Sequence, residues 1–86
     1  MKYSDLYVTR IRSLCRQHGI TLYQLHELSG VSQSTLSNIM CGHSQNQKVL
    51  TLHKIALAFG MTLAEFLDFR ELNEYAFDDN EENFDF

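Results

Sequence analysis

Short polar side chains without any charge occupy the stretch between Val31 and Gly42. If this stretch is helical, its polar members gather on one face and its apolar members on the other. Amide and hydroxyl groups hydrogen-bond to base edges and phosphate oxygens, which makes them suited to reading nucleic acids. An ordinary polar surface helix is the alternative, although a solvent-facing helix without charge is unusual. The predicted hydrogen-bonding face comprises Gln33, Ser34, Ser37 and Asn38, with Thr35 near its edge.

The histidines and cysteines show no spacing typical of a catalytic or metal centre. The chain has four His and two Cys, but no HExxH, CxxC or nucleophile motif. We therefore predict no enzyme activity, no metal and no cofactor. Cys15 and Cys41 are expected to be reduced thiols that are buried as small hydrophobic side chains.

Two short helices joined by a tight turn are predicted to present the polar face. Thr21 and Gln24 form a capping box at the start of the first helix, and Gly30 ends it. Ser32 caps the second helix, and Gly42 stands where a left-handed C-terminal residue belongs. The apolar stripes of the pair are Leu22, Leu25 and Leu28, then Val31, Leu36, Ile39 and Met40. A helix, a Gly-containing turn and a second helix make the helix-turn-helix pattern.

Three further helices are expected to cover the apolar side of this motif. Residues 4–18 form the first helix of the chain, capped by Ser4 or Asp5. Thr51 caps a helix over residues 52–59. Thr62 and Glu65 open a last helix with a second capping box, which either ends after Leu67 or runs on through Phe69 to Leu72 or beyond. Their apolar stripes are Leu6 or Tyr7, Ile11, Leu14 and Cys15, then Leu52, Ile55, Ala56 and Phe59, then Leu63, Phe66 and Leu67.

Charge is divided unevenly along the chain, whose formal net charge is −4 over 86 residues. Residues 1–70 carry seven basic and four acidic side chains, a net charge of +3, whereas residues 71–86 carry seven acids and no base. We predict one all-α domain over residues 1–70 and an acidic tail over residues 71–86, either a helical extension or disordered. The tail also holds aromatic residues, Tyr75, Phe77, Phe84 and Phe86. These favour docking, either on the basic face of the same chain or on a second subunit.

The basic side chains of the first helix fall largely outside its apolar stripe. They are Arg10, Arg12 and Arg16, with His18 nearby. For any one of them a solvated face is the alternative, but beside a helix-turn-helix they are candidates for phosphate contact. The polar loop over residues 43–50 is either a connector or a second contact with a DNA backbone.

The N-terminus lacks the apolar core of a secretory signal, and the longest apolar run is too short to span a bilayer. We therefore expect a cytoplasmic protein without membrane contact. A chain of 86 residues leaves no room for a separate ligand domain, so we expect no small-molecule effector.

Residues 20–68 resemble the phage lambda-repressor/Cro-like helix-turn-helix family, also called the XRE family of bacterial and phage regulators. The resemblance rests on IRSL in the first helix, ITLYQLHELSGVSQSTLSNIMCG across the motif, LTLHKIALAFG in the fourth helix and MTLAEFL in the fifth. It implies a five-helix lambda-repressor-like domain, a recognition helix in the major groove of double-stranded DNA, and dimeric binding to a two-fold site.

The resemblance also implies roles for single residues. Facing bases and nearby phosphates would be Gln33, Ser34, Thr35, Ser37 and Asn38. By the same resemblance Leu22 and Tyr23 would lie at the start of the helix that crosses the DNA backbone. The other predicted backbone contacts follow from the basic and polar residues themselves: Arg12, Arg16, Ser32, His43 and Lys48.

The chain departs from the family pattern at several places. His26 stands where the family generally has Ala, so its side chain is expected to tilt outwards or to find a partner. Cys15 and Met40 replace a basic residue and a Glu that some phage members pair, which avoids desolvating two charges. The Pro that often follows the recognition-helix loop is absent, with Gln47 near its place.

These features predict a sequence-specific DNA-binding protein that represses transcription by occupying an operator. The alternative is a protein-interaction or antitoxin-like module that uses the same fold. The acidic, aromatic tail favours the alternative, whereas the uncharged face of residues 33–38 favours DNA binding.

Overall fold

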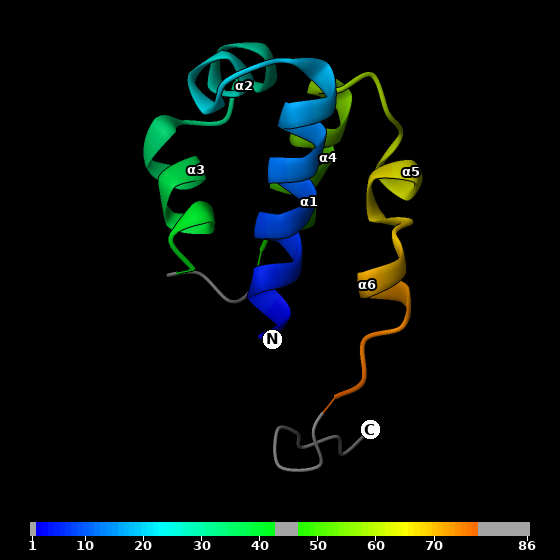
Figure 1. Ribbon diagram of the computed structural model, residues 1–86. Helices are drawn as coiled ribbons and strands as arrows, with labels where there is room; N and C mark the ends of the chain where they lie inside the picture. Colours follow the sequence, from blue (N-terminus) through cyan, green and yellow to red (C-terminus); the bar gives the residue numbers. More distant parts are fainter. Residues whose placement is uncertain (1, 43–46, 78–86) are drawn as a thin grey trace.

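Six helices build the part of the chain that the computed structural model describes, residues 2–42 and 47–77 (Figure 1). They are α1 (Tyr3–His18), α2 (Leu22–Ser29), α3 (Gln33–Met40), α4 (Val49–Ala58), α5 (Leu63–Leu67) and α6 (Arg70–Asn73). No strand occurs within those two ranges. The helix α1 lies at the centre with α4 behind it, while α2 and α3 flank one side and α5 and α6 the other. The all-α prediction is confirmed, and α6 is added to the five expected helices.

The side chains predicted to begin helices do so for α2, α3 and α5. Thr21 Oγ1 accepts the Gln24 backbone N–H at 3.1 Å, and Gln24 Oε1 accepts the Thr21 N–H at 2.8 Å. Thr62 and Glu65 form the same reciprocal pair at the start of α5. These bonds satisfy backbone donors that the first turn of a helix leaves free. Local sequence therefore sets these three helix starts, the Ser32 cap of α3 included.

Two predicted helix starts are wrong. Ser4 is not a cap but a buried residue inside α1, which begins at Tyr3 after Lys2, and Asp5 accepts the Lys2 backbone N–H from within the first turn. Thr51 is the third residue of α4, inside its first turn, because this helix begins at Val49 after Lys48. In both cases the residue before the helix has no capping side-chain bond. Burial of Ser4 and Leu6 favours the early start of α1, whereas Val49 and Leu50 in the first turn of α4 are exposed.

The core is formed by α1, α2, α3, α4 and α5 together. Of the apolar stripes predicted from the sequence, both Leu6 and Tyr7 are buried, and Phe66 of α5 is fully enclosed. The cluster comprises Tyr7, Ile11, Leu14, Cys15, Leu25, Val31, Leu36, Ile39, Leu52, Ile55, Ala56, Phe59 and Phe66. Leu28 was expected in the same stripe as Leu25, but it is 61% exposed. Leu25 is the buried residue of α2. Leu28 lies three residues later, about 60° around the helix from Leu25, and this shift is enough to place its side chain in solvent.

Of the two alternatives for the last helix, continuation to Leu72 is excluded, because the chain breaks after Leu67 and restarts as α6. Arg10 of α1 explains the break. Its Nε donates to the Phe66 carbonyl and its Nη2 to the Glu65 carbonyl, both at 2.9 Å. The last carbonyls of a helix lack intrahelical partners, so a guanidinium that binds them ends the helix favourably. The Arg10 side chain also lies over the Phe69 ring, at 5.0 Å from its centroid.

The segment after α6 returns to the start of the chain. Phe77 stacks on the Tyr3 ring with centroids 5.5 Å apart, and Tyr75 meets Tyr3 edge-on at 5.2 Å. The first part of the predicted tail therefore docks by its aromatic rings on the N-terminal turn of α1. The predictions for residues 78–86, Phe84 and Phe86 among them, lie outside the described residues.

Candidate nucleic-acid interface

The turn between α2 and α3 is held by one glycine, one buried residue and one histidine. Gly30 has φ 76°, a left-handed conformation that ends α2 without the strain a side chain would cause. Val31 follows it into the core at 5% exposure. The Nδ1–H of His26 donates to the Val31 carbonyl at 2.7 Å, and the His26 ring lies 5.6 Å from the Tyr23 ring. Of the two expectations for His26, the structure shows the second: its side chain has a hydrogen-bond partner. The bond connects α2 to Val31, the residue before the Ser32 cap.

The two predicted faces of α3 are confirmed. Leu36 and Ile39 are buried at 3% and 1% exposure. The polar residues Gln33, Ser34, Ser37 and Asn38 are exposed. Thr35 lies at the edge, where its hydroxyl accepts a hydrogen bond from the Ser32 hydroxyl at 2.9 Å. An uncharged hydrogen-bonding surface is therefore presented by a helix whose other side is anchored in the core.

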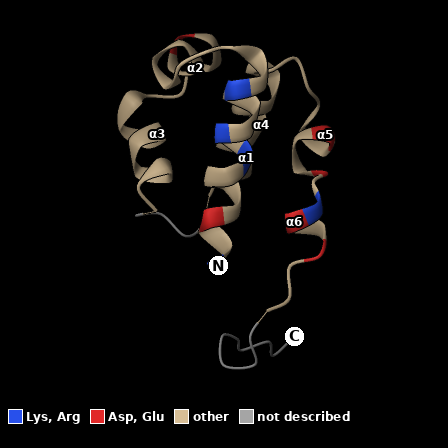
Figure 2. Ribbon diagram, viewed as in Figure 1, with Lys and Arg blue, Asp and Glu red and all other residues tan. Residues whose placement is uncertain are grey.

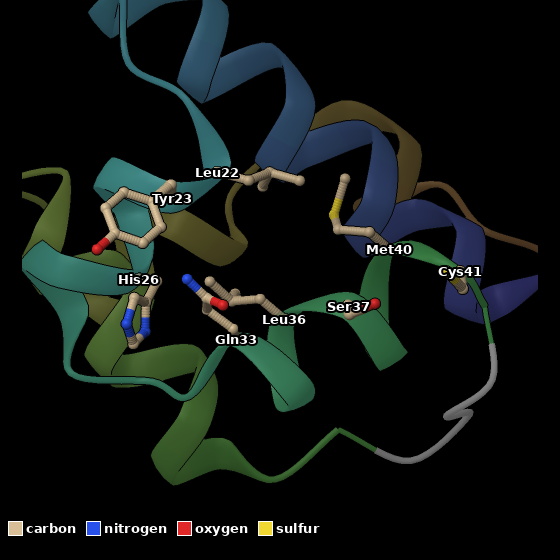
Figure 3. A pocket seen from close by; sticks show the side chains of 8 residues that line it. All are labelled: Leu22, Tyr23, His26, Gln33, Leu36, Ser37, Met40 and Cys41. Carbon is tan, nitrogen blue, oxygen red and sulfur yellow. The ribbon is translucent and has the colours of Figure 1, made fainter.

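A groove of about 330 Å³ runs between α2 and α3 (Figure 3). Its lining residues are Leu22, Tyr23 and His26 of α2, with Gln33, Leu36, Ser37, Met40 and Cys41 from α3 and its end. Leu36 forms part of the floor, while the amide of Gln33 and the hydroxyl of Ser37 are available at the rim. None of these lining residues is Asp, Glu, Lys or Arg. The groove thus joins part of the polar face to an apolar surface.

Charge is segregated around this surface. Figure 2 shows α3 without any charged residue, basic residues along α1 after an acidic one near its start, and acidic residues on α2, α5 and α6, with a basic residue on α6 as well. Arg12 and Arg16 are exposed, and neither forms an ion pair within residues 2–42 and 47–77. Arg10 differs from them because its guanidinium is bound to α5. Arg12 and Arg16 are therefore the arginines of α1 whose guanidinium groups are directed to solvent.

Comparison with family models decides what this arrangement is. The model of the Cro/C1-type HTH DNA-binding domain matches residues 10–71, most of the chain. The chain belongs to this family. Membership of this family indicates that the HTH domain binds DNA and that it acts in the regulation of transcription. A comparison with curated proteins finds no match.

The family match covers every predicted contact residue of the HTH domain, and the structure describes all but one of them. Leu22 and Tyr23 are 40% and 56% exposed at the start of α2. Ser32 is exposed while its hydroxyl caps α3 at 3.1 Å. Lys48 is exposed before α4, and His43 lies outside the described residues. The structure places the residues of α2 and α3 next to one another and leaves Lys48 at the start of a separate helix.

The thiols of the HTH domain differ from each other. Cys15 is buried, as predicted, and burial raises the pKa of its thiol. Cys41 was predicted to be buried too, but it is exposed at the edge of the groove. Cys41 follows the last residue of α3, where the helix no longer directs it inward. Within the described ranges, no group of three or more His, Cys, Asp or Glu side chains is arranged to hold a metal ion.

None of the helices in the described part of the HTH domain is both long and apolar enough to cross a membrane.

Two contacts near the interface were not predicted from the sequence. His26 was recognised as unusual, but its bond to Val31 depends on the turn geometry. The role of Arg10 could have been suspected, because it lies four residues from both Leu6 and Leu14 and hence beside the buried stripe.

Proposed function

We propose that this HTH domain is a sequence-specific repressor of transcription that acts by occupying an operator in double-stranded DNA. The observation that carries the proposal is the face of Gln33, Ser34, Ser37 and Asn38, exposed and free of charge on a helix fixed by its buried side. Amide side chains of this kind bind adenine in the major groove through two hydrogen bonds, and hydroxyls accept or donate at several base edges. A cytoplasmic location, where such DNA is found, goes with the proposal.

Two sets of contacts divide the work. Bases and nearby phosphates face Gln33, Ser34, Thr35, Ser37 and Asn38, whereas the DNA backbone is held by Leu22, Tyr23, Arg12, Arg16, Ser32, His43 and Lys48. The first backbone N–H groups of α2 have no partner within the helix, and the start of a helix favours an anion, so a phosphate is expected near Leu22 and Tyr23. Loss of one two-bond base contact lowers the binding free energy by about 1–3 kcal/mol.

Binding as a homodimer supports this function, since a body with a net charge of only +3 gains little from phosphate attraction. The apolar side chains Val49, Leu50 and Leu57 of α4 are 62–64% exposed. Leu50 and Leu57 are seven residues apart, so they share one helix face. This face is the contact we propose for the second copy.

The test begins with selection of bound sequences from a random DNA pool. We expect a recurring half-site in two-fold arrangement. Gln33→Ala should then weaken binding about 10-fold or more and relax the preference at one base position. Gln17→Ala removes the same exposed amide from α1, distant from α3 in sequence, and serves as the matched control. A pool without enrichment, or equal losses for both variants, would refute sequence-specific reading by α3.

The dimer contact is tested on the selected DNA. The variant L50Q/L57Q should bind the two-fold site more weakly while its affinity for an isolated half-site stays the same. Equal affinity of the variant and the original protein for the two-fold site would exclude α4 as the contact.

A protein-interaction or antitoxin-like module is the second candidate. It is favoured by the exposed apolar side chains of α2, Leu22, Tyr23 and Leu28, and by the overall charge of −4. A module of this kind would bind random DNA and its own promoter equally weakly in a mobility shift. The selection experiment therefore separates the two candidates before any partner is known.

A further inference from the structure

We propose that residues 78–86 of the same chain dock in the groove between α2 and α3, with Phe84 and Phe86 as the anchoring side chains. The inference about the groove itself does not require DNA. Its consequence for regulation rests on the proposed function, because a docked segment would cover the rim formed by Gln33 and Ser37.

The shape and chemistry of the groove fit an aromatic occupant. Leu22, Leu36 and Met40 provide an apolar surface, and Met40 offers a thioether, which packs well against aromatic rings. A volume of about 330 Å³ exceeds what a single methyl group of a base would fill. Most HTH contacts to DNA are polar, so an apolar groove of this size on the reading side calls for another occupant.

The path of the chain brings this segment within reach. Phe77 is anchored on Tyr3 at the start of α1, and Figure 1 shows that the start of α1 and the end of α3 lie at the same end of the molecule. Seven residues separate Phe77 from Phe84, and an extended chain of that length spans about 23 Å. That span is comparable with the 24 and 21 Å of the two shorter axes of the molecule, so the part of the groove that Phe84 would reach is its end at Met40 and Cys41.

Charge complementarity favours the same placement. Residues 78–86 carry five acids and no base. No acidic side chain lines the groove, and α1, which contacts α3, carries the exposed Arg12 and Arg16. The acids of the segment would meet the cations that we assign to DNA phosphates. The tether to Phe77 gives the segment an effective concentration in the millimolar range, so that weak contacts suffice.

The groove contains its own reporters for a test. Cys41 lies exposed at its edge, while the buried Cys15 with its raised pKa serves as an unreactive internal reference. We expect iodoacetamide to alkylate Cys41 about fivefold more slowly in the full chain than in the variant F84A/F86A, since docking at the tethered concentration protects the thiol. The variant N80A changes the same segment without an anchor and should react like the full chain.

Methyl NMR provides a second readout that needs neither the thiol nor DNA. With ¹³C-methyl methionine, the Met40 signal should shift between the full chain and F84A/F86A, whereas the signal of Met61, which packs against the core, should not. Equal alkylation rates together with an unmoved Met40 signal would overturn the proposal. Protection that increases with protein concentration would also overturn it, because a second copy would then be the source of the segment.

The regulatory consequence is measured separately. If docking competes with DNA, F84A/F86A should bind the selected site about fivefold more tightly at low salt, with a smaller difference at high salt because charge attraction is screened. Thiol protection without any gain in DNA affinity would confirm docking and count against the DNA contacts assigned to Gln33 and Ser37. The two proposals can therefore fail independently.

Discussion

Replacing His26 with alanine tests whether one side chain sets the presentation of α3. The change removes the 2.7 Å bond from Nδ1 to the Val31 carbonyl, a loss of about 1 kcal/mol of unfolding free energy. It also removes the ring contact with Tyr23, which contributes about 0.5 kcal/mol because both rings are partly in water. Alanine has a higher helix propensity than histidine, which raises the free energy of unfolding by about 0.5 kcal/mol. The expected net loss is about 1 kcal/mol, or about 4–8 °C in Tm for a domain of this size.

The measurement compares His26→Ala with His53→Ala in urea unfolding followed by circular dichroism. His53 is exposed within α4, and no hydrogen bond or ring contact of its side chain occurs in the described part of the chain. His53→Ala should therefore be neutral or stabilise by about 0.5 kcal/mol through helix propensity. The free energies of unfolding of the two variants should differ by about 1–1.5 kcal/mol. A difference near zero would show that the bond to Val31 contributes nothing to the turn.

DNA affinity supplies the second half of the same test. Because His26 joins α2 to the residue preceding the Ser32 cap, its loss should weaken binding to the selected site even where the protein remains folded. His53→Ala should bind as the original protein does. Unchanged affinity of His26→Ala in the folded state would mean that Gly30 and Val31 alone fix the angle of α3.

Further variants test the contacts that build the interface. Ser32→Ala should destabilise the protein by about 1 kcal/mol in thermal unfolding through loss of the α3 cap, whereas the exposed Ser34→Ala should change stability little. Arg10→Met should destabilise by about 1–3 kcal/mol by freeing two α5 carbonyls, yet leave the salt dependence of DNA binding unchanged. Arg16→Met should do the reverse, lowering the salt slope by about one unit at unchanged stability. Burial, then the hydrogen bond to Tyr3, raises the pKa of Tyr7 above its unfolded value. Its contribution is therefore complete below about pH 10 and is lost at higher pH, a loss that Tyr7→Phe should reduce in unfolding measured from pH 9 to 11. A salt slope altered by Arg10→Met, or an identical alkaline profile for Tyr7→Phe, would contradict the contacts that these residues make here.

Prediction from the sequence succeeded where the cause is local. The capping pairs at Thr21 and Thr62 and the Ser32 cap lie within one helical turn, so residue types and spacing suffice to place them. The two faces of α3 were also predictable, because a period of 3.6 residues separates Leu36 and Ile39 from the polar positions.

Errors arose where the cause is distant in the chain. The position of Arg10 beside the buried stripe pointed to an inward role, but it did not identify the partner, the carbonyls of Glu65 and Phe66 in the last turn of α5, 55 and 56 residues later. The start of α4 at Val49 placed two large apolar residues in solvent, against the local preference for a cap at Thr51. Cysteine is a residue type that is usually buried, but Cys41 is exposed because it lies at the end of α3.

The sequence by itself determined the helix-turn-helix motif, its caps, its uncharged face and the contrast between a basic body and an acidic tail, because each depends on neighbours in the chain. The tertiary structure decided which side chains remain free to act. It bound Arg10 to α5, gave His26 a partner in Val31, and opened the groove between α2 and α3. The physical reason is that hydrogen bonds and burial between separate helices depend on crossing geometry, which no local pattern of residue types contains.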